Sequence, residues 1–368
     1  MTPLLAKVTP AYVKLLSRLD PAAQLTADDE FLIELNSVFS EKANATGSTN
    51  QPRFYKFDQR LSFDSVADPV LLAPKSLDAV IADRAQSIVD LDRPLKLFWS
   101  GGIDSTLMVA AILPKIKHRD QVAIYHTCES LRENPLFIDH VQSFNVNTVM
   151  WSDAWSTPFA ADDVVVTGTS SDEITGSLDQ SFFAQYSNSL SRTWQDFFLQ
   201  HRKSDQFIAR CEQLFAQCPV EIQTVFDARW WFYFYIRHTY YARRDWNINL
   251  ENDFEHNVVQ FYNCADFDSW SMLNKHSLYG DRYSDYKYCF KQAIHDRWPN
   301  DDFLRNKEKV NSYVSDQWVT KKNAVLKQSY LFIYKSNTGF KTFRPSQYPF
   351  VSLQNTVSAL AQLQGTDQ

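Results

Sequence analysis

The chain has 368 residues, of which 44% are hydrophobic and 22% charged, as is typical of a folded globular protein with one large or two modest domains. Its formal net charge of −6 argues against a protein that binds nucleic acid through a broad basic surface. Five cysteines lack paired C-x-x-C spacing, and no basic flank with an apolar run marks a signal peptide. These features favour free thiols in a reducing cytoplasm and no membrane association.

The N-terminal segment, residues 1–75, shows no recognisable chemistry and is expected to form a cap of helical and extended structure. Its pattern predicts helices at 10–20 and 28–40, a polar loop at 41–51 and the start of a strand at 54–57. We therefore place the functional part of the chain after this segment.

Strands and helices alternate over residues 76–190, which we expect to form the core domain. A helix with Ser76 as its N-cap precedes the first strand, and further helices are predicted after the Ser100-Gly101-Gly102 turn and at 135–141. The predicted strands are short and rich in apolar residues, and they lie at 95–99, 122–126, 146–151 and 163–167. Such strands indicate an α/β fold with a parallel sheet between helices, in which ligands bind at the carboxyl ends of the strands.

From about residue 178 the pattern becomes helical, and 191–350 is expected to form a helical region that completes the site, followed by a tail at 351–368. The predicted helices lie at 182–186, 194–200, 207–215 and 222–241. Trp230 and its aromatic neighbours, close to several arginines, could stack on bases, but a helix buried on nearly all sides is the more ordinary explanation.

The first predicted strand ends in Ser100-Gly101-Gly102-Ile103-Asp104-Ser105, directly before a helix. Backbone N–H groups in such a turn attract anions, and glycines let a phosphate approach the backbone closely. Ser100 and Ser105 can add hydroxyl donors. Asp104 would repel a bare phosphate and therefore suggests a bridging Mg²⁺. An ordinary Gly-Gly turn is the alternative.

The fourth predicted strand delivers a similar loop, Thr167-Gly168-Thr169-Ser170-Ser171-Asp172-Glu173. Parallel strands end at one edge of their sheet, so Asp172 and Asp104 could share one Mg²⁺ on a triphosphate. The alternative is that these small polar and acidic residues only cap the start of a helix, which requires no ligand.

Ser-Gly-Gly-Ile-Asp-Ser resembles the PP-loop of the ATP pyrophosphatases. With the second loop it resembles the asparagine synthetase and β-lactam synthetase family, in which Ser-Gly-Gly-Leu-Asp-Ser precedes Ser-Gly-(Glu or Tyr)-Gly-Ser-Asp-Glu. This resemblance implies an adenine nucleotide α-hydrolase-like fold with ATP bound by Ser100–Ser105. It also implies Mg²⁺ held by Asp104 and Asp172, with Thr167 and Gly168 near the nucleotide.

Two downstream segments extend the resemblance, which covers about residues 76–330. Leu304–Lys309 is similar to the family's Arg-x-Lys segment, whose lysine, here Lys307, stabilises charge on the acyl-adenylate and pyrophosphate. Ser284–Lys291 resembles the helix that carries a lysine before an apolar stripe. Taken alone, Lys307 would be read as a solvated surface lysine.

The chain departs from the family where the second substrate would bind. Thr169 replaces the family's Glu or Tyr and is no strong general base at neutral pH. Gln260–Asp268 stands where Glu-x-Arg-x-Pro-Phe is expected. Only about 75 residues precede the core, so no glutaminase domain is expected in this chain. The nucleophile would be free ammonia, ammonia from a separate donor, or a substrate amine.

The resemblance implies a cytoplasmic ATP-dependent ligase that adenylates a small carboxylate, releases pyrophosphate and forms an amide with an amine or ammonia. Asp104, Asp172 and Lys307 would carry the chemistry. Two alternatives stay open: a PP-loop enzyme that modifies a nucleobase or nucleotide, although nucleic acid is an unlikely partner, and a catalytically inactive nucleotide-binding module.

Overall fold

The structure is a computed structural model. It describes five helical positions between 31 and 39, strands at 55–58, 330–336 and 339–343, and most of residues 71–308. Within 71–308, the residues outside the description are 151–159, 161, 170, 179 and 238–257. The chain divides into two compact units: residues 1–67, 203–217 and 314–368 form one, and residues 68–202 and 218–313 form the other.

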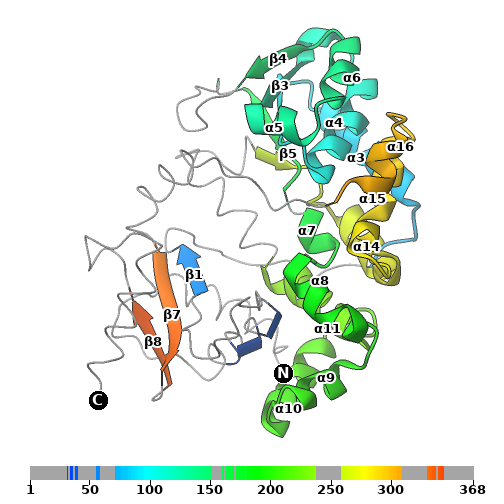
Figure 1. The fold of residues 1–368 in the computed structure, drawn as a ribbon. Coiled ribbons are helices and arrows are strands. Elements are labelled where there is room, and N and C mark those ends of the chain that lie inside the picture. The colour runs from blue at the N-terminus through cyan, green and yellow to red at the C-terminus, as the bar shows by residue number, and fades with distance from the viewer. Residues whose placement is uncertain are drawn as a thin grey trace. The chain divides into compact units, whose positions relative to one another are not determined.

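The second unit is built on a five-stranded, all-parallel sheet surrounded by helices (Figure 1). Its strands are β2 (Leu95–Trp99), β3 (Val122–His126), β4 (Asn147–Met150), β5 (Val164–Thr167) and β6 (Val258–Gln260), in the order β4-β3-β2-β5-β6. The α/β prediction is confirmed, and β2 to β5 lie within one or two residues of the predicted strands. β6 was not predicted, because three residues are too few for an alternating pattern.

The direction in which successive strands are added across the sheet reverses between β2 and β5, although all five strands run parallel. From β2 the chain adds β3 and β4 on one side, then returns to add β5 and β6 on the other. Leu97 pairs with Ile124 of β3 and with Val166 of β5, and all three side chains are buried. Loops that leave β2 and β5 therefore start side by side, at the point where doubly wound sheets hold their ligands.

The helices nearest the sheet follow from local signals. Ser76 caps α3 (Leu77–Val89) by accepting a hydrogen bond from the Ala79 N–H at 3.2 Å. α4 (Ile103–Ile112) follows the glycine turn, as predicted, and is buried along almost its whole length. α5 (Cys128–Glu133), which was not predicted, starts with a capping box, and α6 (Phe137–Ser143) lies two residues beyond the predicted 135–141.

The remaining helices of this unit are short. The α-helices are α7 (Ser171–Ile174), α8 (Gln180–Tyr186), α9 (Trp194–Gln200), α11 (Val225–Trp231), α14 (Ala265–Asn274), α15 (Tyr288–His295) and α16 (Asp301–Asn306). The 3-10 turns are η1 (Leu113–Lys115), η2 (Arg119–Gln121), η3 (Ser187–Ser189), η5 (Lys275–Ser277) and η6 (Tyr283–Asp285).

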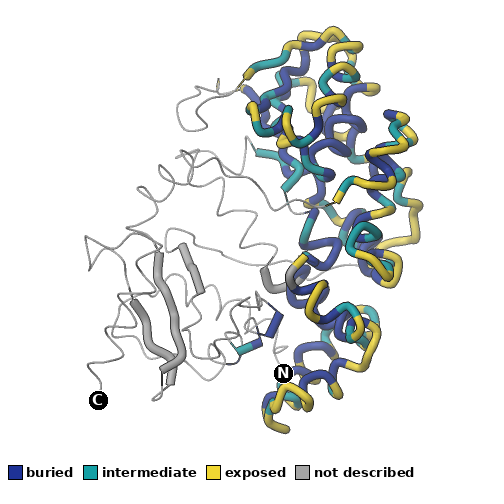
Figure 2. The backbone as a smooth tube through the Cα atoms, viewed as in Figure 1, coloured by how far each residue is buried: buried dark blue, intermediate teal, exposed yellow. Residues whose placement is uncertain are grey.

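The prediction of one long helix over residues 222–241 is wrong. A capping box at Thr224 starts α11 only at Val225, and the chain changes to a π-helix, η4 (Phe232–Arg237). Residues 238–241 lie outside the described part. All seven residues of α11 are buried, which confirms the core interpretation for the described part of this aromatic stretch (Figure 2).

The first unit contains an antiparallel sheet, β1-β7-β8, formed by β1 (Tyr55–Asp58), β7 (Tyr330–Ser336) and β8 (Gly339–Phe343). β1 matches the predicted strand, whereas β7 and β8 fall in the stretch expected to be helical. α10 (Asp205–Phe215) packs against part of the predicted 28–40 helix, where the rings of Phe31 and Phe207 lie 5.4 Å apart. The predicted helix at 10–20 and loop at 41–51 lie outside the described residues.

Two expectations about chemistry on the scale of the whole chain can be compared with the structure. In its described parts, no helix combines the length and apolar composition needed to cross a bilayer. All five cysteines are free thiols.

A buried carboxyl in α14 makes stability depend on pH. Burial raises the pKa of Asp268 to about 7, and no described residue hydrogen-bonds its Oδ1. In the unfolded chain the pKa of an aspartate is about 3.9, so the folded state loses stability as pH rises from about 4 to about 7. In the Asp268→Asn variant this side chain cannot ionise. The melting temperature of the variant minus that of the wild type should therefore increase by several degrees as pH is raised from about 5 to about 8.

Asp120→Asn is the matched control, because the Asp120 side chain is 88% exposed. Its melting temperature should follow that of the wild type across the same range. Parallel curves for Asp268→Asn and wild type would contradict a raised pKa at Asp268.

Candidate functional site

The first loop is a tight turn that connects the end of β2 to the start of α4. Gly101 has a φ of +82°, and a Cβ there would collide with the Ser130 carbonyl oxygen of α5. Ser105 is buried and accepts a hydrogen bond from the Ser100 N–H at 3.0 Å, and the two hydroxyl oxygens lie 2.9 Å apart. The two serines thus close the turn on itself, and the first helical residue, Ile103, buries its side chain.

The second loop leaves β5 and touches the first loop. A Cβ on Gly168 would lie 2.8 Å from both Cα and N of Ser105, so only glycine allows this approach. Thr167 and Thr169 pair their hydroxyls at 2.6 Å, and the Thr167 carbonyl accepts the Phe261 N–H at 2.8 Å. The loops expected at one sheet edge are in backbone contact.

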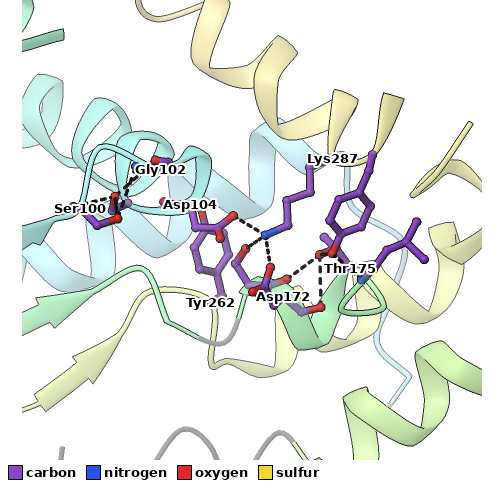
Figure 3. A network of polar contacts seen from close by, with 11 residues as sticks. Ser100, Gly102, Asp104, Asp172, Thr175, Tyr262 and Lys287 are labelled. Atoms are coloured by element: carbon purple, nitrogen blue, oxygen red, sulfur yellow. Dashed lines mark hydrogen bonds and ion pairs between the residues drawn. The ribbon is translucent and has the colours of Figure 1, made fainter. Parts of the chain in front are cut away.

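Asp104 and Asp172 converge on one cation, and that cation is the ammonium of Lys287. Lys287 Nζ lies 2.6 Å from Asp104 Oδ1, 2.6 Å from Asp172 Oδ1 and 2.8 Å from Ser171 Oγ. Figure 3 shows this nitrogen between the two carboxylates. Lys287 is fully buried, whereas the carboxylate side chains are 25% and 30% exposed. The lysine therefore approaches from the protein interior, and the carboxylates keep an outward side.

The charge state of Lys287 depends on its partners. Burial by itself lowers the pKa of the Lys287 ammonium, but the negative charges of Asp104 and Asp172 outweigh burial, so the pKa lies above its ordinary value. The lysine is cationic at neutral pH and cancels about half of the charge of the pair.

Two tyrosines flank this network, of which Figure 3 labels Tyr262. The Tyr262 hydroxyl donates to the Asp104 carbonyl oxygen at 2.8 Å, and the Tyr286 hydroxyl lies 2.8 Å from Thr175 Oγ1. Lys287 itself has a left-handed backbone, with φ of +59°, at the start of α15. A residue with a Cβ adopts this conformation at a cost of about 1 kcal/mol.

Lys307 reaches the first loop through a different partner. It caps the C-terminal end of α16, and its Nζ lies 3.0 Å from Glu133 Oε1 at the end of α5. Lys291 fixes the Lys307 backbone by donating to its carbonyl oxygen at 3.2 Å. Lys307 therefore lies in a partly buried ion pair beside the glycine turn and is not a solvated surface lysine.

The segment expected to bind the second substrate lies beside the second loop. Gln260 ends β6 and pairs with Thr167 of β5, so Gln260–Asp268 starts beside the second loop. Arg84 holds this corner by donating to the carbonyl oxygens of Gln260 and Phe261 at 2.8 and 3.0 Å. Thr169 lies at the same edge, with its hydroxyl paired to Thr167.

The donor set fits Mg²⁺ only in part. Among the described residues, no group of three or more His, Cys, Asp or Glu side chains is placed to hold a metal ion. Asp104 and Asp172 supply carboxylate oxygens from two loops, and Mg²⁺ prefers six oxygen ligands. The pair therefore suits an ion that brings most of its ligands with it, as Mg²⁺ bound to phosphate oxygens and water does.

Sequence reasoning assigned no role to Lys287 or Glu133. Lys287 lies within Ser284–Lys291, the segment that resembles a lysine-bearing helix, but its partners are 183 and 115 residues away in the chain. Charge balance could have predicted a cation here, because two carboxylates at one sheet edge are stable only when a positive charge compensates them. No comparable signal pointed to Glu133, whose helix was not predicted.

Comparison with known proteins adds no family to this picture. No protein-family model matches the chain, and a search of curated proteins finds no significant match.

Replacing Lys287 tests whether its ammonium holds the two loops together. Lys287→Met removes the charge and leaves Asp104 and Asp172 facing one another, so unfolding free energy should fall by about 3 kcal/mol in urea titrations. Adding Asp172→Asn should restore part of this loss, because one uncompensated charge disappears. Wild-type stability in Lys287→Met would rule out the role assigned to the lysine.

Proposed function

We propose that this chain is an ATP-dependent ligase that forms an amide by way of an acyl-adenylate, with release of AMP and pyrophosphate. The observation that supports it most is that Asp104 and Asp172 meet beside the Ser100–Ser105 turn. This turn lies where the order of strand addition across the parallel sheet reverses. This is the arrangement that the resemblance to asparagine and β-lactam synthetases implies. Under this proposal the fold is that of the PP-loop ATP pyrophosphatases.

The turn would receive the phosphates of ATP. Backbone N–H groups at the start of the ten-residue helix α4 provide partial positive charge, and the glycines leave room for phosphate oxygens. Asp104 and Asp172 would hold Mg²⁺, which supplies charge neutralisation on the triphosphate. Lys287 makes this possible from behind, since it reduces the repulsion between the two carboxylates and the incoming phosphates.

The proposed reaction has two balanced steps. A carboxylate oxygen of the acid substrate attacks the α-phosphorus, the bond from that phosphorus to the bridging oxygen breaks, and pyrophosphate leaves. An amine nitrogen then attacks the acyl carbon, the carbon–oxygen bond to AMP breaks, and the nitrogen loses a proton to solvent. Lys307, beside the turn, would stabilise negative charge on the departing pyrophosphate.

Thr169 and the Gln260–Asp268 corner would face the second substrate. Thr169 replaces the Glu or Tyr of the related synthetases, and Gln260–Asp268 lacks their Glu-x-Arg-x-Pro-Phe segment, so the product is proposed to differ from asparagine. A small amine or free ammonia that arrives already deprotonated needs no strong base, because adenylation has already supplied a good leaving group.

Lys307→Ala separates binding from chemistry. We expect the variant to bind Mg·ATP about tenfold more weakly than wild type, yet to lose about 100-fold or more, at saturating Mg·ATP, in carboxylate-dependent exchange of labelled pyrophosphate into ATP. Calorimetry measures the binding, and a panel of small carboxylic acids supplies the first substrate.

Lys275→Met serves as the matched control. Lys275 is also a buried lysine paired with an aspartate, with its Nζ 3.0 Å from Asp227 Oδ1, but it lies in η5, away from both loops. It should lower stability and leave ATP affinity unchanged. If no acid yields AMP and pyrophosphate and Asp104→Asn leaves ATP affinity unchanged, the proposed ligase is wrong; binding without turnover would instead indicate a nucleotide-binding module.

A further inference from the structure

A second ion pair lies at the glycine turn, apart from the Lys287 network. Glu133 Oε1 accepts from Lys307 Nζ at 3.0 Å, and the same ammonium lies 3.4 Å from the Glu133 carbonyl oxygen. The two side chains are only 13% and 11% exposed. An ion pair this secluded from solvent is weakly screened, so it holds both side chains in place.

The position of Glu133 follows from the way α5 is attached to the end of β2. Ser130 Oγ donates to the Trp99 carbonyl oxygen at 2.9 Å, which anchors the first turn of the helix against the strand. Glu133 follows three residues later, on the same side of the helix. A Cβ on Gly101 would lie 3.0 Å from Glu133 Cβ, and a Cβ on Gly102 would lie 3.5 Å from its Oε1. The carboxylate therefore lies against the two glycines.

This placement sets two anions in competition. The turn that would receive phosphate already has the Glu133 carboxylate beside it. A bound phosphate and this carboxylate would both pair with the Lys307 ammonium. The backbone of Lys307 is held independently, because its N–H donates to Phe303 O at 3.1 Å and its carbonyl accepts from Lys291. Only the flexible end of the lysine side chain needs to change partner.

We propose that Glu133 is a positioning residue, which holds the Lys307 ammonium at the glycine turn and gives it up to the phosphate groups of a bound nucleoside triphosphate. This inference rests on the proposed nucleotide-binding function. Glu133 keeps the lysine within reach of the turn before the ligand arrives. The phosphate oxygens, which carry more charge than one carboxylate, then take its place.

Inorganic pyrophosphate with Mg²⁺ is the probe, since it presents the phosphates without a nucleoside, and Mg·ATP is titrated in parallel. In Glu133→Gln the lysine loses its competing anion, so pyrophosphate should bind about fivefold more tightly than to wild type. Glu129→Gln removes the same charge from the same helix and should leave affinity unchanged. In a Lys307→Ala background, Glu133→Gln should raise the logarithm of the pyrophosphate affinity by less than half as much as it does in the wild-type background.

Thermal melts check that each variant is folded. If Glu133→Gln fails to fold, Glu133→Asp shortens the side chain by one methylene, breaks the pair and should tighten binding about twofold. Equal or weaker pyrophosphate binding by the folded Glu133 variant, with normal ATP binding by wild type, overturns the inference and leaves the proposed function standing. An equal gain with and without Lys307 also overturns it. Wild-type protein that binds neither ligand removes both proposals.

Discussion

The buried ammonium of Lys287 is the interaction on which the candidate site depends. It joins two loops that come from separate strands and a helix that begins more than 100 residues later. Removing an ammonium from water is costly unless charges of opposite sign compensate it. Asp104 and Asp172 provide that compensation, and in return the lysine allows two carboxylates to lie within reach of one atom. Each of the three charges lowers the electrostatic cost of placing the other two at this site.

Backbone contact between the loops is the second requirement. Gly168 lets the second loop lie against Ser105, and Gly101 lets α5 lie against the first turn. A side chain at either position would separate elements that have to touch. The chain has only eight glycines, and these two are used where the sheet edge is most crowded. The strand order brings the loops together, and the glycines set how close they come.

The site has two lysines with different surroundings. Lys287 is fully buried behind the carboxylates, where its charge offsets theirs. Lys307 is held at its backbone and paired through the end of its side chain. The proposed reaction, which binds a highly charged phosphate chain and then releases part of it, would use both kinds of cation. One would balance fixed charge, and the other would follow the charge that moves.

Local patterns in the sequence determined the α/β class, four of the five parallel strands, the Ser76 cap and the glycine turn before α4. Each is decided by residues adjacent in the chain, through apolar runs, capping hydroxyls and backbone freedom. Tertiary structure alone decided that Lys287 lies between Asp104 and Asp172, and that Lys307 pairs with Glu133. Those contacts join residues 115 to 183 positions apart, and no local pattern records which distant charge will fill a buried gap.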